Sequence, residues 1–177
     1  MTTQPIRWVM LLRGINVGGH AKLPMADLKS LLASKGASDI TTYIQSGNVV
    51  FSAACAPDPF LKTMWDHIEA NHGFRKTALM VDAQTFQDRA QFPFATDSPK
   101  TGHIFFHTGL AKPDLQMIDS LRAPSEEIRI TDHATYLHTP DGFGRSKLAA
   151  HLESALGTPA TARNLATVNA LLTMITP

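Results

Sequence analysis

A nearly continuous apolar run, residues 6–12, constrains the fold of this chain more than any other feature of its sequence. The run contains Trp8, Val9 and Met10, and it ends at a glycine-rich segment, residues 13–19, of sequence Arg-Gly-Ile-Asn-Val-Gly-Gly. A strand with one face in water alternates apolar and polar residues, whereas a strand covered on both faces stays apolar. We therefore expect residues 6–12 to form a central strand of a sheet.

Residues 6–82, including the apolar run, indicate a βαββαβ order. Apolar residues at helical spacing predict the helices, and alternating or wholly apolar runs bounded by turn residues predict the strands. The predicted strands are residues 6–12, 39–45, 49–51 and 77–81, and the predicted helices are residues 25–36 and 58–73. This order is that of the split-βαβ, ferredoxin-like arrangement.

The second half partly repeats this order. The predicted elements are helices at residues 83–92, 113–122, 145–156 and 164–175 and strands at residues 102–108, 127–131 and 134–139. With 44% hydrophobic and 18% charged residues, the chain falls in the ordinary globular range. We expect an α+β protein with a ferredoxin-like βαββαβ N-terminal lobe, residues 1–93. A smaller α/β C-terminal lobe of order βαββαα, residues 94–177, would end in two helices.

Two polar loops should meet at one end of the N-terminal sheet. In a split-βαβ sheet the first strand ends where the second strand turns into the third, so residues 13–22 should lie beside residues 45–48. We call these two segments the rim. The backbone amides of glycines can bind an anion. The planar guanidinium of Arg13 can bond a phosphate or carboxylate at two points, and the ammonium of Lys22 adds a compact positive charge. The candidate ligand-binding residues of the rim are Arg13, Asn16, Gly18, Gly19, Lys22, Gln45, Ser46 and Asn48.

The rim is not a known nucleotide loop. Gly14 and Gly19 have the spacing of G-x-x-x-x-G-K-[ST], but His20 and Ala21 stand where that pattern requires Lys and Ser or Thr. No G-x-G-x-x-G follows the first strand. A plain alternative stays open, in which the glycines only shape a wide loop and Asn16 only braces it.

A second polar group lies in the C-terminal lobe. Arg145 and Lys147 follow a glycine turn and open a helix, and Arg163 precedes the last helix. The start of a helix binds anions through its free backbone amides, and nearby cations strengthen that binding. Arg145, Lys147 and Arg163 are therefore candidates to complete a pocket with the rim. The alternative is a solvated helix start, with Asn164 serving as an N-cap.

Composition and spacing exclude several other classes. The net charge of +1 argues against a strongly basic nucleic-acid protein, and the histidines show no metal-binding spacing. The single cysteine, Cys55, and the lack of a signal peptide indicate a cytoplasmic protein. No stretch approaches the ~20 apolar residues that span a bilayer, so we expect no membrane partner. We expect no cofactor and no metal.

The same motifs carry a family resemblance. Residues 11–19 with Pro24 and Met25, and then residues 42–51, closely resemble the bacterial family called Domain of Unknown Function 1697. Residues 144–148 and 161–168 are similar to its C-terminal signatures. The resemblance implies a two-lobed α+β protein but supplies no catalytic residue, because the family has no established activity. One departure is Leu165, where an aromatic residue, usually Trp, is common.

Three functions follow as hypotheses. The leading one is binding of an anionic or phosphorylated small ligand at the rim, because its polar loops converge without an acid/base pair. The second is a small hydrolase or transferase with its site between the lobes, using His20 or an aspartate as base. The third is an RNA-binding module, which would need exposed aromatic residues such as Trp8 or Tyr43. The sequence does not decide whether the chain is an enzyme.

Overall fold

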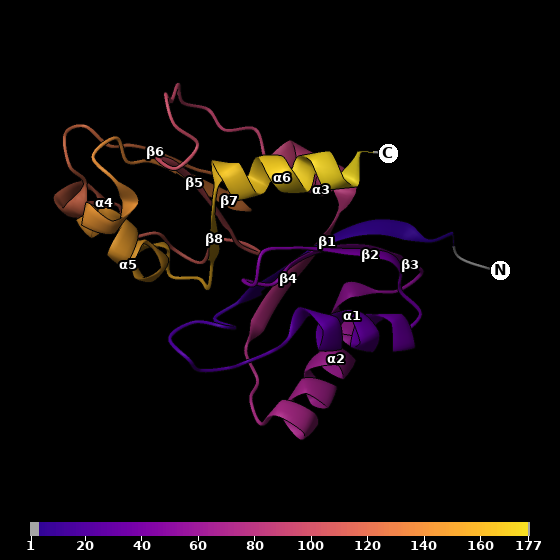
Figure 1. The fold of residues 1–177 in the computed structure, drawn as a ribbon. Helices are drawn as coiled ribbons and strands as arrows, with labels where there is room; N and C mark the ends of the chain where they lie inside the picture. Colours follow the sequence, from indigo (N-terminus) through magenta and orange to yellow (C-terminus); the bar gives the residue numbers. More distant parts are fainter. Residues whose placement is uncertain (1–3, 177) are drawn as a thin grey trace. The chain divides into compact units, whose positions relative to one another are not determined.

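The computed structural model describes residues 4–176 and confirms the α+β class (Figure 1). The chain divides into two compact units: Met1–Gln87 with Ala170–Pro177, called unit 1, and Asp88–Asn169, called unit 2. The boundaries fall inside α3 (Ala83–Arg89) and α6 (Leu165–Ile175). Each unit contains one four-stranded sheet, and each is described by itself.

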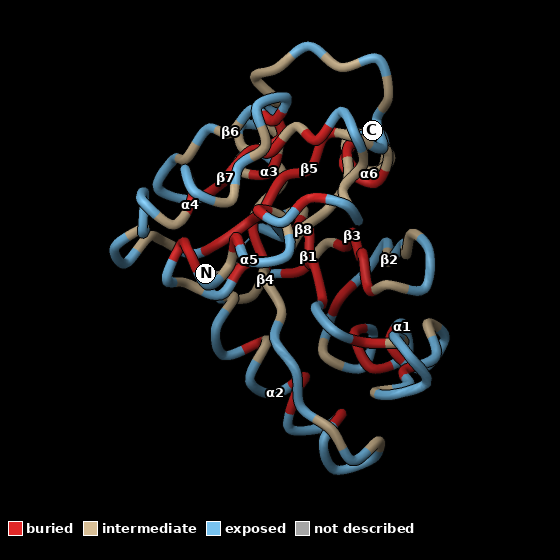
Figure 2. Tube along the Cα trace, turned by 90° about the vertical axis from the view of Figure 1, so that its left-hand side faces the viewer, coloured by how far each residue is buried: buried red, intermediate tan, exposed pale blue. Residues whose placement is uncertain are grey.

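Unit 1 has the expected βαββαβ order. Its elements are β1 (Ile6–Arg13), α1 (Met25–Ser34), β2 (Ser38–Tyr43), β3 (Asn48–Ala53), α2 (Pro57–His72) and β4 (Thr77–Asp82). The sheet order is β2-β3-β1-β4, and every neighbouring pair is antiparallel. The strand predicted to be central is therefore central, and its residues 8–12 are all buried. Figure 2 shows that, within this sheet, the buried residues are concentrated in β1 and β3.

Helices α1 and α2 cover one face of this sheet. Trp8, Met10 and Leu12 of β1 project to that face, as alternate residues of a strand do, and pack in one core with the apolar stripes of both helices. Leu28 of α1 and Met64 of α2 are fully buried in this core. This packing leaves the end of β1, at Arg13, as the point where the chain leaves the core and enters solvent.

Unit 2 repeats the strand order of unit 1. Its elements are β5 (Gly102–Phe106), α4 (Leu115–Leu121), β6 (Glu127–Ile130), β7 (Ala134–His138), a 3-10 turn η1 (Phe143–Arg145), α5 (Lys147–Leu156) and β8 (Thr161–Asn164). The sheet order β6-β7-β5-β8 matches β2-β3-β1-β4 position for position, and all pairs are antiparallel. Each unit is therefore a βαββαβ sheet of the same topology.

The structure adds one strand to the predicted order. β8 lies between α5 and α6 and pairs with β5, where the sequence gives only a helix start. The helix start is also real, because Asn164 Oδ1 accepts a hydrogen bond from the Thr167 amide at 2.9 Å. The neighbouring Leu165 is buried, so its side chain fills core space.

Candidate functional site

The two rim loops lie side by side in unit 1, as the strand directions predict. The Leu12 amide donates to the Gly47 carbonyl at 2.8 Å, and Asn16 Nδ2 donates to the Gln45 carbonyl at 2.7 Å. The first contact joins the end of β1 to the β2–β3 turn, and the second joins the loops themselves. The rim is thus one connected surface formed by two segments about thirty residues apart in the chain.

Asn16 uses its side chain to hold the rim together. Its Nδ2 also donates to the Leu23 carbonyl at 2.9 Å, and its Oδ1 accepts from the Leu23 amide at 2.8 Å. Its backbone has a left-handed φ of 55°, a conformation that asparagine tolerates better than most residues. The interpretation of Asn16 as a brace therefore fits the geometry, and little of its amide is left for a ligand.

Replacing Asn16 with alanine should loosen the rim without removing any charge. The substitution deletes three side-chain hydrogen bonds and places a less suitable residue at a positive φ, so we expect unit 1 to lose about 2 kcal/mol of stability. Urea unfolding measures the loss. Hydrogen exchange at the Leu23 amide should accelerate, and unchanged protection there would contradict the brace.

Residues 16–21 form a small projecting hairpin. The His20 amide donates to the Val17 carbonyl at 3.1 Å, and the Asn16 amide donates to the Ala21 carbonyl at 3.0 Å. Gly18 and Gly19 have φ values of 59° and 78°, as the two central residues of a type I′ turn require. These two candidate residues therefore have a conformational role at the tip, which is exposed to solvent.

The second rim loop is also braced internally. Asn48 is fully buried, and its Nδ2 donates to the Tyr43 carbonyl at 3.1 Å and to Ser46 Oγ at 2.9 Å. Gln45, by contrast, is exposed. Of the polar candidates in this loop, Gln45 is the one whose side chain is most accessible to a ligand.

A basic pocket opens beside the rim. It has a volume of about 440 Å³ and is lined by Arg13, Gly14, Arg75, Lys76 and Thr77. The register of β1 against β4 places Arg13 directly opposite Thr77. The pocket therefore lies where β1 ends and β4 begins, and three of its five lining residues carry a positive charge.

The cations near this pocket differ in how far they are neutralised. Arg75 pairs with Asp66 and, through Nε at 2.9 Å, with Glu69, and these hydrogen bonds raise the pKa of the Arg75 guanidinium. Within residues 4–176, by contrast, neither Lys22 nor Lys76 forms an ion pair or a side-chain hydrogen bond. Arg13 is exposed at the strand end. Lys76 is therefore the cation of the pocket lining that no described residue neutralises.

Sequence reasoning missed Arg75 and Lys76. The signal was present, because β4 runs antiparallel to β1 and the residues before β4 must therefore lie at the end of β1. The basic pair precedes the apolar strand directly. Applying the strand-direction argument to the fourth strand as well as to the second and third would have found them.

The three cations predicted for the other lobe lie in unit 2. Arg145 ends η1, and Lys147 begins α5, where Ser146 Oγ caps the helix by accepting from the Ala149 amide at 2.9 Å. Arg163 lies in β8 and donates to Thr161 Oγ1 at 3.1 Å and to the Ala162 carbonyl at 2.9 Å. Burial lowers the pKa of Arg163 to about 10, so it is charged at neutral pH. Their participation in a pocket with the rim stays a prediction.

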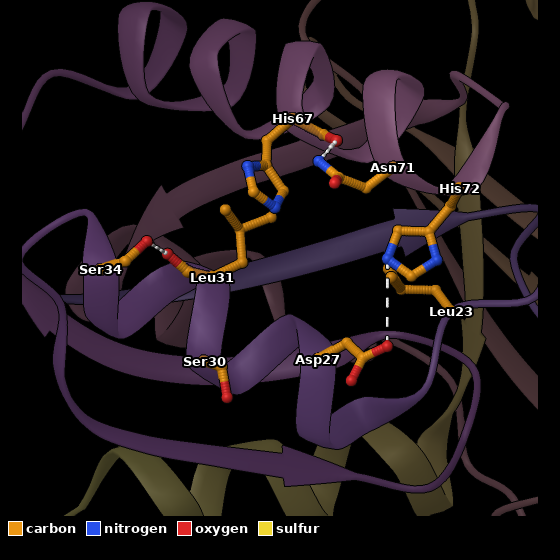
Figure 3. A pocket seen from close by; sticks show the side chains of 8 residues that line it. All are labelled: Leu23, Asp27, Ser30, Leu31, Ser34, His67, Asn71 and His72. Carbon is orange, nitrogen blue, oxygen red and sulfur yellow. Dashed lines mark hydrogen bonds and ion pairs between the residues drawn. The ribbon is translucent and has the colours of Figure 1, made fainter.

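A second pocket in unit 1, of about 490 Å³, lies between α1 and α2 (Figure 3). His67 and His72 point from α2 toward α1, and His72 Nε2 lies 4.0 Å from Asp27 Oδ2. Ser34 Oγ donates to the Leu31 carbonyl at 2.7 Å, and Ser30 points away from the histidines. The pocket therefore holds no assembled pair of nucleophile and base.

A third pocket, of about 340 Å³, lies in unit 2 and contains His138. His138 Nδ1 lies 3.1 Å from Glu127 Oε1 on the neighbouring strand. The nearby hydroxyls of Thr96 and Thr101 bond to each other at 2.8 Å. This pocket therefore contains a carboxylate–histidine pair, but the two threonine hydroxyls bond to each other and not to the imidazole of His138. Within residues 4–176 no group of three or more His, Cys, Asp or Glu residues could hold a metal ion.

The fold and this site define a class: an α+β protein with two antiparallel βαββαβ sheets and a cation-lined pocket at one strand end. The family described as "Protein of unknown function (DUF1697)" matches residues 6–136, and the chain belongs to this family. The match includes the rim and the basic pocket and ends before Arg145, Lys147 and Arg163. No curated protein matches the chain.

One solved structure, described as that of conserved bacterial protein SP0830 from Streptococcus pneumoniae, is similar to this chain over nearly its whole length. The TM-score is 0.73 at 20% sequence identity, and the alignment covers 97% of this chain and 99% of the other. At this identity the likeness establishes the shared fold. None of the helices within residues 4–176 has the length and apolar character needed to cross a bilayer.

Proposed function

We propose that this protein binds an anionic small ligand, one that carries a phosphate or carboxylate group, at the basic pocket beside the rim. The supporting observation is that Arg13 and Lys76 line one pocket, and that Lys76 has no carboxylate partner within residues 4–176. Like charges gathered around a pocket repel each other, and a bound anion converts that repulsion into charge-assisted hydrogen bonds. We place this binding in the cytoplasm.

The rim residues have two roles in this proposal. Arg13 and Lys76 line the pocket and contact the ligand, and the exposed Lys22 and Gln45 are the rim side chains available to a ligand that extends beyond the pocket. Asn16, Ser46 and Asn48 hold the loops in place through the internal bonds described above. Gly18 and Gly19 supply the turn at the tip.

Neither alternative function has a comparable observation in its favour. A hydrolase or transferase needs a histidine or carboxylate in the pocket, and its lining residues are two arginines, a lysine, a glycine and a threonine. An RNA-binding sheet needs exposed aromatic rings. Trp8 is only 6% exposed, and its Nε1 donates to the Ala53 carbonyl at 3.1 Å.

Lys76→Gln and Arg13→Gln test the proposal with inorganic phosphate as the probe. We expect wild-type protein to show saturable shifts of the Gly14 and Thr77 amide signals in an NMR titration. Each variant should bind at least about tenfold more weakly, because a hydrogen bond to a charged group contributes roughly 1.5–3 kcal/mol. Citrate in place of phosphate compares a carboxylate ligand with a phosphate.

The matched control is Lys29→Gln. Lys29 is exposed on α1, has the same charge and lies outside the pocket lining. If Lys29→Gln and Lys76→Gln weakened phosphate binding equally, the loss would come from the change in net charge, and a defined pocket would be contradicted. The absence of any saturable shift in the wild-type protein would contradict anion binding altogether.

A further inference from the structure

We propose that the rim docks this protein onto the surface of an anionic lipid bilayer, with Val17 and Ile44 entering the headgroup boundary. The inference rests on the proposed function for its electrostatic part, and it adds the source of the anion, which is the lipid headgroup. The argument uses three features of the rim and of Ile44, which directly precedes its second segment: exposed apolar tips, a strained backbone at one tip, and cations in and beside the first segment that no described residue neutralises.

The apolar tips belong to the two adjacent loops. Val17 is 65% exposed and Ile44 is 55% exposed, and together they make up half of the large apolar residues exposed within residues 4–176. The hydrogen bond from Asn16 to Gln45 ties the residue before one tip to the residue after the other. Single exposed apolar residues are normal on protein surfaces, but two on neighbouring braced turns form a surface with a preferred apolar partner.

The backbone at Ile44 is strained. Its φ of 51° lies in the left-handed region, which a β-branched residue adopts at a cost that glycine or asparagine would avoid. The residue gains little burial in return, because it is 55% exposed. Folding alone therefore gives little reason for isoleucine at this position, whereas an apolar contact outside the chain does.

The charges around the tips have one sign. The first rim segment contains Arg13, His20 and Lys22, and neither rim segment contains an aspartate or glutamate. Lys22 and Lys76 are not neutralised by any described residue. Basic residues close to an anionic leaflet are attracted to it, and apolar side chains next to them gain by entering the headgroup boundary.

A bilayer suits this surface better than another polyanion. A nucleic acid backbone would engage the cations but leave Val17 and Ile44 against phosphate and water. An acidic protein would need a separate pocket for each projecting tip, whereas a bilayer admits apolar tips anywhere on its surface. The expectation of no membrane partner rested on the absence of a spanning segment, which surface docking does not require.

Vesicle sedimentation of the full chain tests the docking. We expect binding to vesicles of equal parts phosphatidylcholine and phosphatidylglycerol, weaker binding at high salt, and little binding to phosphatidylcholine alone. Val17→Ser and Ile44→Asn should each lower the partition coefficient about tenfold or more. Lys22→Gln should lower it about fivefold. Leu115→Ser, at a residue that is 61% exposed on α4, is the control and should change nothing.

The Ile44→Asn variant separates docking from folding. Asparagine tolerates the left-handed backbone, so this variant should melt at a higher temperature than wild type while it binds vesicles more weakly. Loss of binding in a more stable protein cannot come from unfolding. Vesicle binding that survives both tip substitutions would overturn the insertion of the apolar tips.

The phosphate titration distinguishes this inference from the proposed function. Phosphate binding without vesicle binding would overturn the docking and leave the anion pocket standing. Absence of both would overturn both proposals. Tighter binding of a single-stranded oligonucleotide or of polyglutamate than of anionic vesicles, weakened by the same tip variants, would also overturn the docking and assign the rim to that other polyanion.

Discussion

Gly47→Ala is expected to cost unit 1 more than about 3 kcal/mol of folding free energy, a large part of the roughly 5–15 kcal/mol that separates folded from unfolded domains. A Cβ at this position would lie 2.6 Å from the Leu12 Cβ and 2.8 Å from the Ile15 Cδ1. Both contacts are far inside van der Waals distance, and Leu12 is anchored in the central strand. The φ of 79° adds conformational strain for any residue with a side chain.

Gly18→Ala is the matched control for this prediction. Gly18 also has a positive φ, 59°, but a Cβ there would meet nothing within 4 Å. The control should therefore cost only about 1 kcal/mol, from backbone strain alone. Urea unfolding of both variants measures the difference. Equal losses would show that the close approach of Gly47 to β1 is not what fixes the β2–β3 turn.

The sequence predicts much of unit 1 because its strongest signals are local and consistent. An apolar run without alternation identifies a strand buried on both faces, and β1 is that strand. Once the order βαββαβ is accepted, the strand directions place residues 13–22 beside residues 45–48 without any further information. The hydrogen bond between Asn16 and Gln45 has the location that this reasoning requires.

The roles of the rim side chains could not be read from residue types. Asparagine can donate its amide inward to a loop carbonyl or outward to a ligand, and the sequence is the same in both cases. The choice depends on loop dihedrals, such as the left-handed φ of Asn16, that only the folded chain defines. The role of a charged residue is easier to predict from the sequence. Lys22, for example, forms no side-chain hydrogen bond or ion pair within the described residues.

Strand β8 is missing from the sequence prediction for a related reason. It has four residues, one of them the charged Arg163, and shows no clear apolar alternation. Its pairing partner, β5, lies more than fifty residues earlier in the chain, so the contact that defines the strand is entirely non-local. The repeat of the unit 1 order was the available clue, since that order requires a fourth strand after the second helix.

His103 makes the stability of unit 2 depend on pH. The ring is 9% exposed and stacks on Phe143 with centroids 3.7 Å apart, and its Nδ1 is buried without a hydrogen-bond partner among residues 4–176. Burial lowers the pKa of His103 from 6.5 to about 4. In the unfolded chain the ring is solvated, so it is protonated with the ordinary histidine pKa of about 6.5. The folded state therefore resists protonation that the unfolded state accepts.

Stability should accordingly fall as the pH drops from 6.5 to 4. Over that range the unfolded state binds a proton that the folded state does not, which lowers the unfolding free energy by about 1.4 kcal/mol per pH unit, and by at most about 3 kcal/mol in all. His107, whose pKa burial also lowers, adds in the same direction. Above pH 6.5 the ring is neutral in both states, and its contribution is constant.

His103→Phe isolates this effect, because phenylalanine keeps the stacking on Phe143 and cannot take up a proton. Unfolding midpoints in urea at pH 7.5 and pH 4.5 should show the variant losing about 2 kcal/mol less than wild type on acidification. The control is His67→Gln, at an exposed histidine of α2, which should lose as much stability between pH 7.5 and pH 4.5 as the wild type does. Carboxylates that titrate near pH 4 are common to all three proteins and cancel in the comparison. If His103→Phe keeps the full acid sensitivity of the wild type, the buried ring is not its source.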